Sequence, residues 1–291
     1  MSMKHITVLG THTGWHYESL RGAFEKRGAQ VRYASADLLR TRTGFESGTL
    51  CPLDDCDALM IRGMPAGSAE QIIYRMDALF TLERAGLPCI NSPKTIEKTV
   101  DKYFTTALLH EAGLPVPPTV CCETDAQALK TALAELGGDM IYKPLFGSCG
   151  KGLVRVTNEA EAESLAQSLS GTGAIAYLQR FIPCSNSDIR AFVLDGRVIA
   201  SMRRIGSGWL ANFSRGGRVE TCSLTAEEEE MAVTAAKAVD AVVAGVDIIR
   251  GNDGSTYVIE VNGSPGWKGL SLVTETDIAG EIADYVLRRA R

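Results

Sequence analysis

The sequence predicts an N-terminal α/β unit built on a parallel sheet, followed by two α+β units. In residues 1–92, short apolar runs alternate with helical segments, which is typical of a parallel sheet covered on both faces. A stiff, proline-rich connector at residues 115–118 indicates entry into the strands of a second unit, whose opening helix precedes it. Two Asp-Gly pairs further along the chain lie beside runs rich in β-branched residues and indicate hairpins. The expected units are residues 1–92, 93–182 and 183–291.

The composition is that of an ordinary globular protein. The chain has 291 residues, of which 45% are hydrophobic and 22% are charged, enough for two or three compact units. A net charge of −5 argues against an obligatory nucleic-acid partner. We find neither a run of about 18 uncharged apolar residues nor a secretory signal. We therefore expect no membrane partner and a cytoplasmic location in which the cysteines stay reduced.

The first unit is expected to form a sheet of short buried strands. Gly28 and Gly86 follow its two helices, and glycine is common just past a helix end. No G-x-G-x-x-G motif follows a strand, which argues against a nicotinamide enzyme. The expected strands are residues 6–10, 30–35, 58–62 and 88–91, and the expected helices are residues 17–27 and 68–84.

The second unit is expected to begin with one long helix that runs to Gly113. Ser92 can cap this helix, and Pro93 suits its first position. Lys98 and Lys102 are four residues apart, so we expect one on the solvent face and the other within reach of a site. Further strands are expected at residues 119–122, 140–144, 153–157 and 175–181, with helices at residues 126–136 and 159–169.

A glycine-rich loop, FGSCGKG at residues 146–152, joins two of these strands. Backbone N–H groups at Gly147, Ser148 and Gly150 can approach phosphate oxygens closely, because glycine leaves the backbone uncovered. Lys143 in the preceding strand adds a positive charge. The loop is not a P-loop, since the first glycine and the final Ser or Thr of that motif are absent. A plain flexible hairpin tip stays open as the alternative.

The first hairpin of the third unit carries charged residues on one face. A two-residue Asp-Gly turn places Asp188 opposite Arg203. The same register places Arg190 opposite Ser201 and all four side chains on one face. A charged hairpin face is often only solvated. Arginines in glycine-rich backbone, as at residues 215–218, nevertheless suit carboxylate or phosphate binding.

Two more helices are expected in the third unit. Thr225 and Glu228 form a capping-box pattern that opens a long helix to about Ala244. Its acidic run at residues 227–230 is expected to be solvated and to complement the helix dipole. The last helix is expected at residues 277–291.

The second hairpin, residues 246–261, points to a metal. With a two-residue turn at Asp253-Gly254, Asp247 lies directly opposite Glu260, and Asn262 is on the same face. Two carboxylates that face each other across a ladder repel, so an unassisted sheet should avoid the pairing. A cation between them reverses that cost. Oxygen ligands suit Mg²⁺, which often shares such ligands with substrate phosphates.

These features resemble the RimK-like branch of the ATP-grasp carboxylate–amine ligases, from about Ile90 to Arg291. The order of the motifs along the chain is far more specific than a glycine-rich loop alone. The motifs are DK at 101–102, IYKP at 141–144, QRFI at 179–182, DIR at 188–190, NFSRGG at 212–217, GVDIIR at 245–250 and EVNGSPGWKGL at 260–270.

The resemblance implies an ATP-grasp fold preceded by a parallel-sheet, pre-ATP-grasp domain, with ATP held between the two α+β subdomains. It implies that the lysines contact the phosphates, that the glycine-rich loop closes over them, and that the backbone of residues 179–181 holds adenine. Asp188 would bind the ribose or lie beside it. The residues expected to bind ATP are Lys102, Lys143, Gly147, Ser148, Gly150, Gln179, Arg180, Phe181, Asp188 and Asn212.

The resemblance also implies a two-step reaction. A substrate carboxylate attacks the γ-phosphate to give an acyl phosphate, and an amine then displaces phosphate to form an amide. Arg203 and Arg215 would face the reacting groups as catalytic residues. Mg²⁺, or Mn²⁺ in its place, would be held by Asp247, Glu260 and Asn262.

The implied substrates are a small-molecule carboxylate acceptor and L-glutamate or a similar amino acid. Leu210 stands where relatives that modify ribosomal-protein tails tend to have arginine. Residues 62–86 and PGWKGL at 265–270 look closer to relatives that add glutamate to tetrahydromethanopterin, so we favour a cofactor or small metabolite as acceptor. We expect residues 263–270 to line its pocket. Alternatives are a protein C-terminus such as a ribosomal tail, a D-alanine–D-alanine-type ligase, and a nucleotide-binding module without turnover; homo-oligomerisation is left open.

Overall fold

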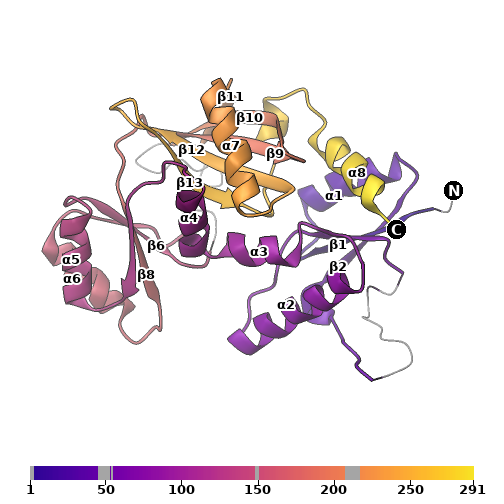
Figure 1. The fold of residues 1–291 in the computed structure, drawn as a ribbon, viewed down its shortest axis with the longest axis horizontal. Helices are drawn as coiled ribbons and strands as arrows, with labels where there is room; N and C mark the ends of the chain where they lie inside the picture. The colour runs from indigo at the N-terminus through magenta and orange to yellow at the C-terminus, as the bar shows by residue number, and fades with distance from the viewer. Residues whose placement is uncertain (1–2, 45–52, 54, 148–150, 207–216) are drawn as a thin grey trace.

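The computed structural model describes residues 3–44, 53, 55–147, 151–206 and 217–291. Its strands form three sheets, of which one is parallel and two are antiparallel. In Figure 1, the parallel sheet and the smaller antiparallel sheet lie toward opposite ends of the molecule, and the five-stranded sheet lies between them. This confirms the combination of an α/β unit with α+β units. No helix within these ranges is both long and apolar enough to cross a bilayer.

The N-terminal sheet is parallel, as expected; helices join its first strand to its second and its third strand to its fourth. Its strands are β1 (His5–Gly10), β2 (Gln30–Ser35), β3 (Ala58–Ile61) and β4 (Cys89–Ile90), in the order β2-β1-β3-β4. The helices of this unit are α1 (Trp15–Glu25) and α2 (Ala69–Arg84). Every residue of β3 is buried, which is typical of a strand covered on both faces.

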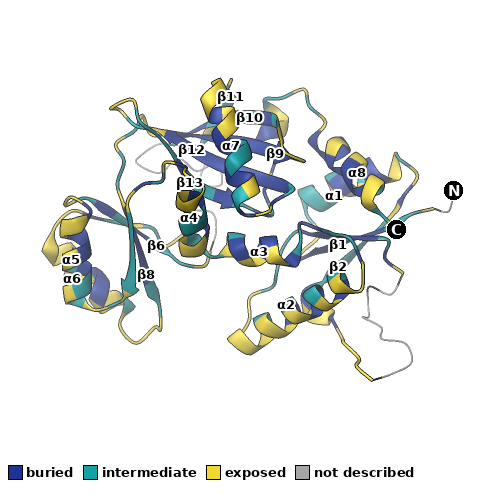
Figure 2. Cartoon of the chain, viewed as in Figure 1, coloured by how far each residue is buried: buried dark blue, intermediate teal, exposed yellow. Residues whose placement is uncertain are grey.

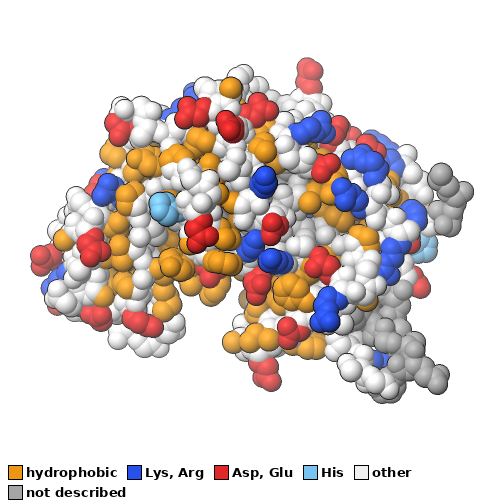
Figure 3. Space-filling model, in the orientation of Figure 1, with side chains coloured by type: hydrophobic (Ala, Val, Ile, Leu, Met, Phe, Trp, Pro, Cys, Tyr) orange, Lys and Arg blue, Asp and Glu red, His pale blue; other side chains and the backbone are white. Residues whose placement is uncertain are grey.

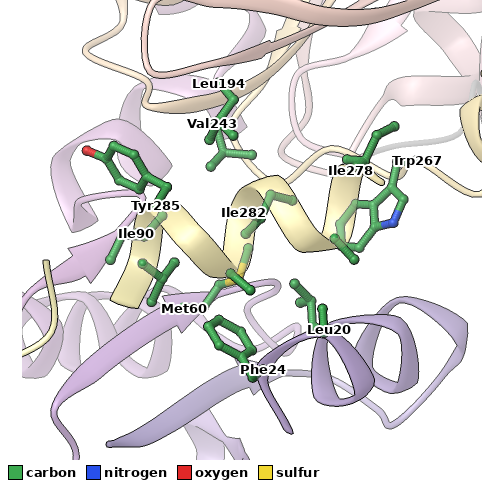
Figure 4. Close-up of a cluster of buried hydrophobic side chains, with 14 of the residues drawn as sticks. Leu20, Phe24, Met60, Ile90, Leu194, Val243, Trp267, Ile278, Ile282 and Tyr285 are labelled. Atoms are coloured by element: carbon green, nitrogen blue, oxygen red, sulfur yellow. The ribbon is translucent and has the colours of Figure 1, made fainter. Parts of the chain in front are cut away.

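The last helix, α8 (Ile278–Arg289), returns to this first sheet. Figure 4 shows Ile282 and Tyr285 of α8 in one cluster with Phe24 of α1 and Met60 of β3. Trp267, which is 1% exposed, lies at the edge of the same cluster. The C-terminus of the chain therefore helps to fasten the N-terminal unit to the rest of the molecule.

The prediction of one continuous helix from residue 93 to 113 is wrong. The segment forms two helices, α3 (Pro93–Val100) and α4 (Lys102–Glu111). Asp101 between them is extended, and its Oδ1 accepts a hydrogen bond from the N–H of Phe104 at 3.0 Å, so it caps the second helix. One of Lys98 and Lys102 was expected on the solvent face, but Lys98 is 9% exposed and Lys102 is half-buried. The Nζ of Lys98 lies 2.6 Å from Asp240 Oδ2.

Two helices pack on one face of the second sheet. Its strands are β5 (Thr119–Glu123), β6 (Met140–Pro144), β7 (Val154–Val156) and β8 (Ile175–Arg180), in the order β5-β8-β6-β7. Helices α5 (Ala126–Glu135) and α6 (Glu159–Leu169) cover Met140, Tyr142 and Leu178 in an apolar cluster. Because side chains alternate along a strand, Lys143 and Gln179 lie on the face opposite these two helices, where Gln179 is 2% exposed.

The third sheet is antiparallel throughout. Its strands are β9 (Ser187–Leu194), β10 (Arg197–Ile205), β11 (Arg218–Thr221), β12 (Val243–Arg250) and β13 (Thr256–Asn262). Helix α7 (Ala226–Ala238) covers one face through an apolar cluster that includes Ile189, Ala191 and Val246. Figure 2 shows the central strands β9 and β12 buried along almost their whole length.

The acidic first turn of α7 differs from the expectation. Glu228 does form the capping box with Thr225, but it is 3% exposed. Its carboxylate accepts two hydrogen bonds from Arg250, at 2.5 and 2.7 Å, from the end of β12. The residue thus joins the helix to the sheet instead of being solvated.

Candidate nucleotide and metal site

The hairpin of β12 and β13 pairs Asp247 with Glu260, which confirms the predicted pairing. The turn itself differs from the prediction. The N–H of Gly251 donates to the carbonyl of Ser255 at 2.7 Å, so the turn comprises residues 252–254. A β-bulge then shifts the register after Asp247 by one residue and restores the pairing. The longer turn and the bulge shift the register by one residue in opposite directions, so Asp247 and Glu260 still face each other.

The hairpin of β9 and β10 contradicts the predicted pairing. Asp188 pairs with Arg204, not Arg203, and Arg190 pairs with Met202, not Ser201. The reason is a bulge between Val198 and Ala200, which moves every later residue of β10 by one place. Arg204 therefore shares the face of Asp188.

Arg203 lies on the alternate face of β10. It pairs with Ile189, whose side chain packs in the apolar cluster beneath α7. Side chains alternate along a strand, so the register places Arg203 away from the two facing carboxylates. The catalytic role assigned to Arg203 stays a prediction, and the register favours Arg204 for contact with this face.

Four buried charges lie together on the face of the third sheet that points away from α7. Arg190 contacts Asp247 through Nε and through Nη2, the latter at 2.8 Å from Oδ2. Arg204 holds Asp188 at 2.5 and 2.7 Å, and its Nη2 is also 2.8 Å from Asp247 Oδ2. All four residues are less than 9% exposed. The two negative carboxylates and the two positive guanidinium groups cancel in charge. Their mutual attraction offsets the free-energy cost of removing them from water.

These neighbours shift the two aspartates in opposite directions. Burial, reinforced by the charge of Asp247, raises the pKa of Asp188 to about 6. Arg190 and Arg204 outweigh burial at Asp247 and hold the pKa of that carboxyl below its ordinary value. Asp247 is thus kept ionised, as a metal ligand must be.

Lys143 and Gln179 form the opposing wall, on the second sheet. Lys143 Nζ donates to Gln179 Oε1 at 2.6 Å, and Gln179 Nε2 donates to the hydroxyls of Tyr177 and Thr119, both at 3.1 Å. Burial, together with the charge of Lys102, lowers the pKa of Lys143 to about 8, although Glu260 and Asp247 oppose the shift. Lys143 forms no ion pair with a carboxylate of the described residues, so its charge is available to a ligand.

Lys102 begins α4 and reaches the glycine-rich loop. Its Nζ donates to the carbonyls of Leu145 and Gly147 at 3.2 and 2.9 Å. Burial lowers the pKa of Lys102, against the charges of Glu260 and Asp101. The break between α3 and α4 therefore places Lys102 at the start of α4, where its side chain reaches the end of β6. Gly147 has a φ of +133°, a conformation that favours glycine.

The segment predicted to hold adenine has its backbone N–H groups already paired. The N–H of Arg180 donates to the carbonyl of Pro118 at 2.8 Å, and that of Phe181 donates to the carbonyl of Asp139 at 3.0 Å. The guanidinium of Arg155 lies 3.7 Å from the centre of the Phe181 ring. A purine that accepted hydrogen bonds from these N–H groups would have to displace the bonds to Pro118 and Asp139.

The residues present fit Mg²⁺ carried with a nucleotide. Glu260 is half-buried and forms no ion pair within the described part of the chain. Asp247 already accepts three guanidinium contacts, which leaves about one of its four lone-pair positions for a cation. Across the described ranges, no group of three His, Cys, Asp or Glu side chains could hold a metal. Two carboxylates and the Asn262 amide therefore suit an ion that takes its other oxygens from phosphate and water.

Several predicted residues lie outside the described residues: Ser148, Gly150, Leu210, Asn212 and Arg215. Of the others, the structure gathers Lys102 and Lys143 at one wall and Asp188, Asp247 and Glu260 at the other. Figure 3 shows the molecule hollowed between the end that carries the second sheet and the end that carries α2. Sequence reasoning missed Arg204 as the partner of Asp188. The bulge in β10 that moves Arg204 into this place is not indicated by any clear local sequence pattern.

Six cysteines lie within the described residues, and all are free thiols: Cys56, Cys89, Cys121, Cys122, Cys184 and Cys222.

Known proteins resemble this chain in sequence and in fold. The RimK-like ATP-grasp domain matches residues 99–286. The chain is 37% identical over 273 residues to the tetrahydromethanopterin:alpha-L-glutamate ligase of Methanosarcina acetivorans, covering 84% of this chain and 83% of the relative. The ligase of the same name from Methanocaldococcus jannaschii is 37% identical over 243 residues, covering 81% of each chain. A solved structure of the ATP-grasp ligase PsnB with its minimal precursor, Mg and ADP has a TM-score of 0.74 at 25% identity, covering 98% of this chain and 97% of that one. The chain belongs to the RimK-like ATP-grasp family.

Proposed function

We propose that this protein is an ATP-dependent carboxylate–amine ligase that joins L-glutamate to a small-molecule carboxylate through an amide bond. The observation that carries the proposal is the pair of facing carboxylates, Asp247 and Glu260, opposite two lysines that lack carboxylate partners within the described residues. An isolated structural sheet gains nothing from such a pairing. Arg190 and Arg204 already neutralise Asp247, so the charge without a partner on this wall is that of Glu260. A magnesium-bound triphosphate would place a cation beside Glu260 and anions beside the two lysines.

Each wall has a separate task. Lys102 and Lys143 would bind phosphate oxygens, which restores the full charge of Lys143 because a bound anion raises its pKa. Asp247, Glu260 and Asn262 would hold Mg²⁺, which neutralises negative charge on the phosphates when it is bound. The glycine-rich loop at residues 146–152 would cover the phosphates and exclude water from the acyl phosphate.

The reaction needs no nucleophile from the protein. The acceptor carboxylate attacks the γ-phosphorus and ADP leaves, and the amine nitrogen of glutamate then attacks the acyl carbon and phosphate leaves, with loss of one proton. Catalysis then rests on positioning and on charge stabilisation. Arg190 and Arg204 serve as positioning residues, since they fix Asp247 in one rotamer and keep it ionised.

For the acceptor, we propose a pterin-type cofactor or a related small metabolite, with Mg²⁺ as the working ion and Mn²⁺ as a substitute. The support is the identity shared with relatives that are named for tetrahydromethanopterin and glutamate. Protein tails are the less favoured acceptor. A module without turnover is disfavoured because both lysines and both facing carboxylates are present.

The test is turnover with defined substrates. Purified protein is given ATP, Mg²⁺, L-glutamate and tetrahydromethanopterin, while ADP release is followed and products are examined by mass spectrometry. We expect ADP release that requires both glutamate and acceptor, together with a product heavier by one glutamyl residue. ATP binding without acceptor-dependent ADP release, across a panel of pterin and other carboxylates, would count against a ligase and for a binding module.

A further inference from the structure

The carboxyl edge of the N-terminal sheet is a natural position for a ligand. In the order β2-β1-β3-β4, the connections leave β1 and β3 in opposite directions, so the crevice between their carboxyl ends is a topological switch point. Open parallel sheets bind ligands at such points. Thr11 follows β1 there, and Arg62 follows β3.

This edge is fastened to the chain that follows the metal ligands. Ser264 Oγ donates to the carbonyl of Ile61 at 3.0 Å, and Arg62 Nη2 donates to the carbonyl of Pro265 at 2.7 Å. The N–H of Trp267 donates to His16 Nε2 at 3.1 Å. Residues 264–267, part of the segment 263–270 that was expected from the sequence to line the acceptor pocket, are therefore held against the N-terminal unit.

Pro265 lies between Arg62 and the charged cluster that contains Arg190 and Asp247. A Cβ atom added at Gly245 would lie 2.8 Å from Pro265 Cβ and 2.8 Å from Arg190 Nη1. Pro265 thus touches β12 two residues before Asp247, and its carbonyl accepts from Arg62 on the other side. Arg62 borders the same site from the N-terminal unit.

Arg62 has hydrogen-bonding capacity that the described protein does not use. Its guanidinium lies 4.8 Å from the centre of the Trp267 ring, and its Nε is buried without an acceptor. No carboxylate of the described residues forms an ion pair with it. Within these ranges Arg32 is the other side chain with such an atom, but it pairs with Thr7 inside the sheet, away from the edge.

The surroundings of Arg62 are cationic or neutral. Burial, with the charges of Arg62, Lys268 and His12, lowers the pKa of His16 to about 4, so this ring is neutral and accepts the Trp267 hydrogen bond. Burial alone lowers the pKa of Arg62 to about 10, which leaves it charged at neutral pH. A buried cation without a counter-ion is costly, and a carboxylate ligand would remove the cost.

We propose that Arg62 binds a substrate carboxylate that is not activated by ATP, so that the N-terminal sheet completes the substrate site. The proposal rests on the ligase function above. The carboxylate belongs either to L-glutamate, which keeps two after amide formation, or to a second acid group of the acceptor. In both cases a planar guanidinium with a free Nε suits the oxygens.

The competing account is that Arg62 only clamps the Pro265 segment. Arg75 offers a matched control for that account, because it is 6% exposed in the same unit and its Nη1 donates to the carbonyl of Pro65 at 2.8 Å. A clamp predicts that Arg62→Gln and Arg75→Gln behave alike, with lower stability and no selective loss of a substrate. Arg62→Lys keeps the charge and tests the need for a planar group.

The experiment measures binding without turnover. L-glutamate and the acceptor acid are titrated separately by calorimetry into protein that holds Mg²⁺ and a non-hydrolysable ATP analogue. We expect Arg62→Gln to weaken one of the two by about 10- to 100-fold, as for loss of a charge-assisted hydrogen bond, while Arg75→Gln changes neither. If the affinity for glutamate is the one that falls, the site belongs to the amino acid. Glutamine, which lacks the side-chain carboxylate, then shows which of the two carboxylates Arg62 binds.

The outcomes separate this inference from the proposed function. Unchanged affinities for both ligands in Arg62→Gln would overturn the inference even if the wild-type protein forms the amide. Equal losses in the Arg62 and Arg75 variants would show a clamp and overturn it as well. Absence of turnover in the wild type, with the selective loss still present, would instead overturn the ligase function alone.

Discussion

Replacing Arg204 with leucine tests both the register of β10 and the buried charge cluster. Arg204 is 8% exposed, holds Asp188 with two nitrogens and lies 2.8 Å from Asp247. Leucine would leave two buried carboxylates with one guanidinium. Removal of one partner of a buried pair typically costs about 3–5 kcal/mol, so we expect a decrease of that size in the free energy of unfolding. This is a large part of the stability of an ordinary domain.

The neighbouring arginine supplies the control. Arg203→Leu removes the same charge from the same strand, but Arg203 is half-buried and forms no ion pair with the described carboxylates. We expect it to change the free energy of unfolding by less than about 1 kcal/mol. Urea unfolding followed by circular dichroism gives both values. An Asp188→Asn/Arg204→Gln double variant, which removes one charge of each sign, keeps the test usable if Arg204→Leu does not fold. A loss in Arg203→Leu equal to that in Arg204→Leu would refute the register and the cluster argument.

Three other positions give predictions of the same kind. Because burial lowers the pKa of Lys143 to about 8, its ammonium loses its proton as the pH rises through that value. ATP affinity measured by calorimetry should then fall by up to about tenfold per pH unit above that pKa. Lys143→Arg should reduce this decline, because arginine stays charged. The same decline in both proteins would exclude Lys143 as its source. Asp101→Ala removes the cap of α4, so we expect a loss of about 0.5–2 kcal/mol in stability and weaker ATP binding through Lys102, whereas Asp101→Asn should retain both. Full ATP affinity in Asp101→Ala would contradict the proposed placement of Lys102. Gly245→Ala brings a methyl group to 2.8 Å from Arg190 and Pro265 and should cost about 1–3 kcal/mol, whereas Gly22→Ala, in open space on α1, should be neutral or stabilising.

Much of the fold follows from local sequence patterns. The alternation of strands and helices in residues 5–90, the caps at Ser92 and Thr225, and the strand at residues 140–144 are as expected. Each depends on nearby residues, on period-two burial or on a side chain that satisfies a helix end. These features require no knowledge of distant contacts.

The differences arise where tertiary packing sets the register. One bulge in β10 moves Arg204 into the place expected for Arg203, because a shift of one residue moves a side chain to the other face. A second bulge, beside Asp247, compensates for a turn longer than expected. Glu228 was expected in solvent, as was one of Lys98 and Lys102. Glu228 and Lys98 are instead buried and pair with Arg250 and Asp240, which lie far away in the sequence. Such pairs cannot be found from local spacing.

The junction at residues 62 and 263–270 shows the same limit. The sequence predicts that the second of these segments lines the acceptor pocket, since it follows the metal ligands directly. It gives no indication that Arg62 of the first unit would reach Pro265 or that Trp267 would lie under its guanidinium. Those contacts depend on how the N-terminal sheet is docked.

The most direct test of the account is Mg²⁺-dependent ATP binding by Glu260→Gln. Glutamine keeps the size of the side chain and removes the charge that faces Asp247. ATP is titrated by calorimetry with Mg²⁺ and with a chelator, and amide formation is measured in parallel. We predict that Mg²⁺ tightens ATP binding in the wild type, and that the variant folds normally but loses that gain together with ligase activity. Wild-type affinity and turnover in Glu260→Gln would contradict the claim that the two facing carboxylates carry the metal.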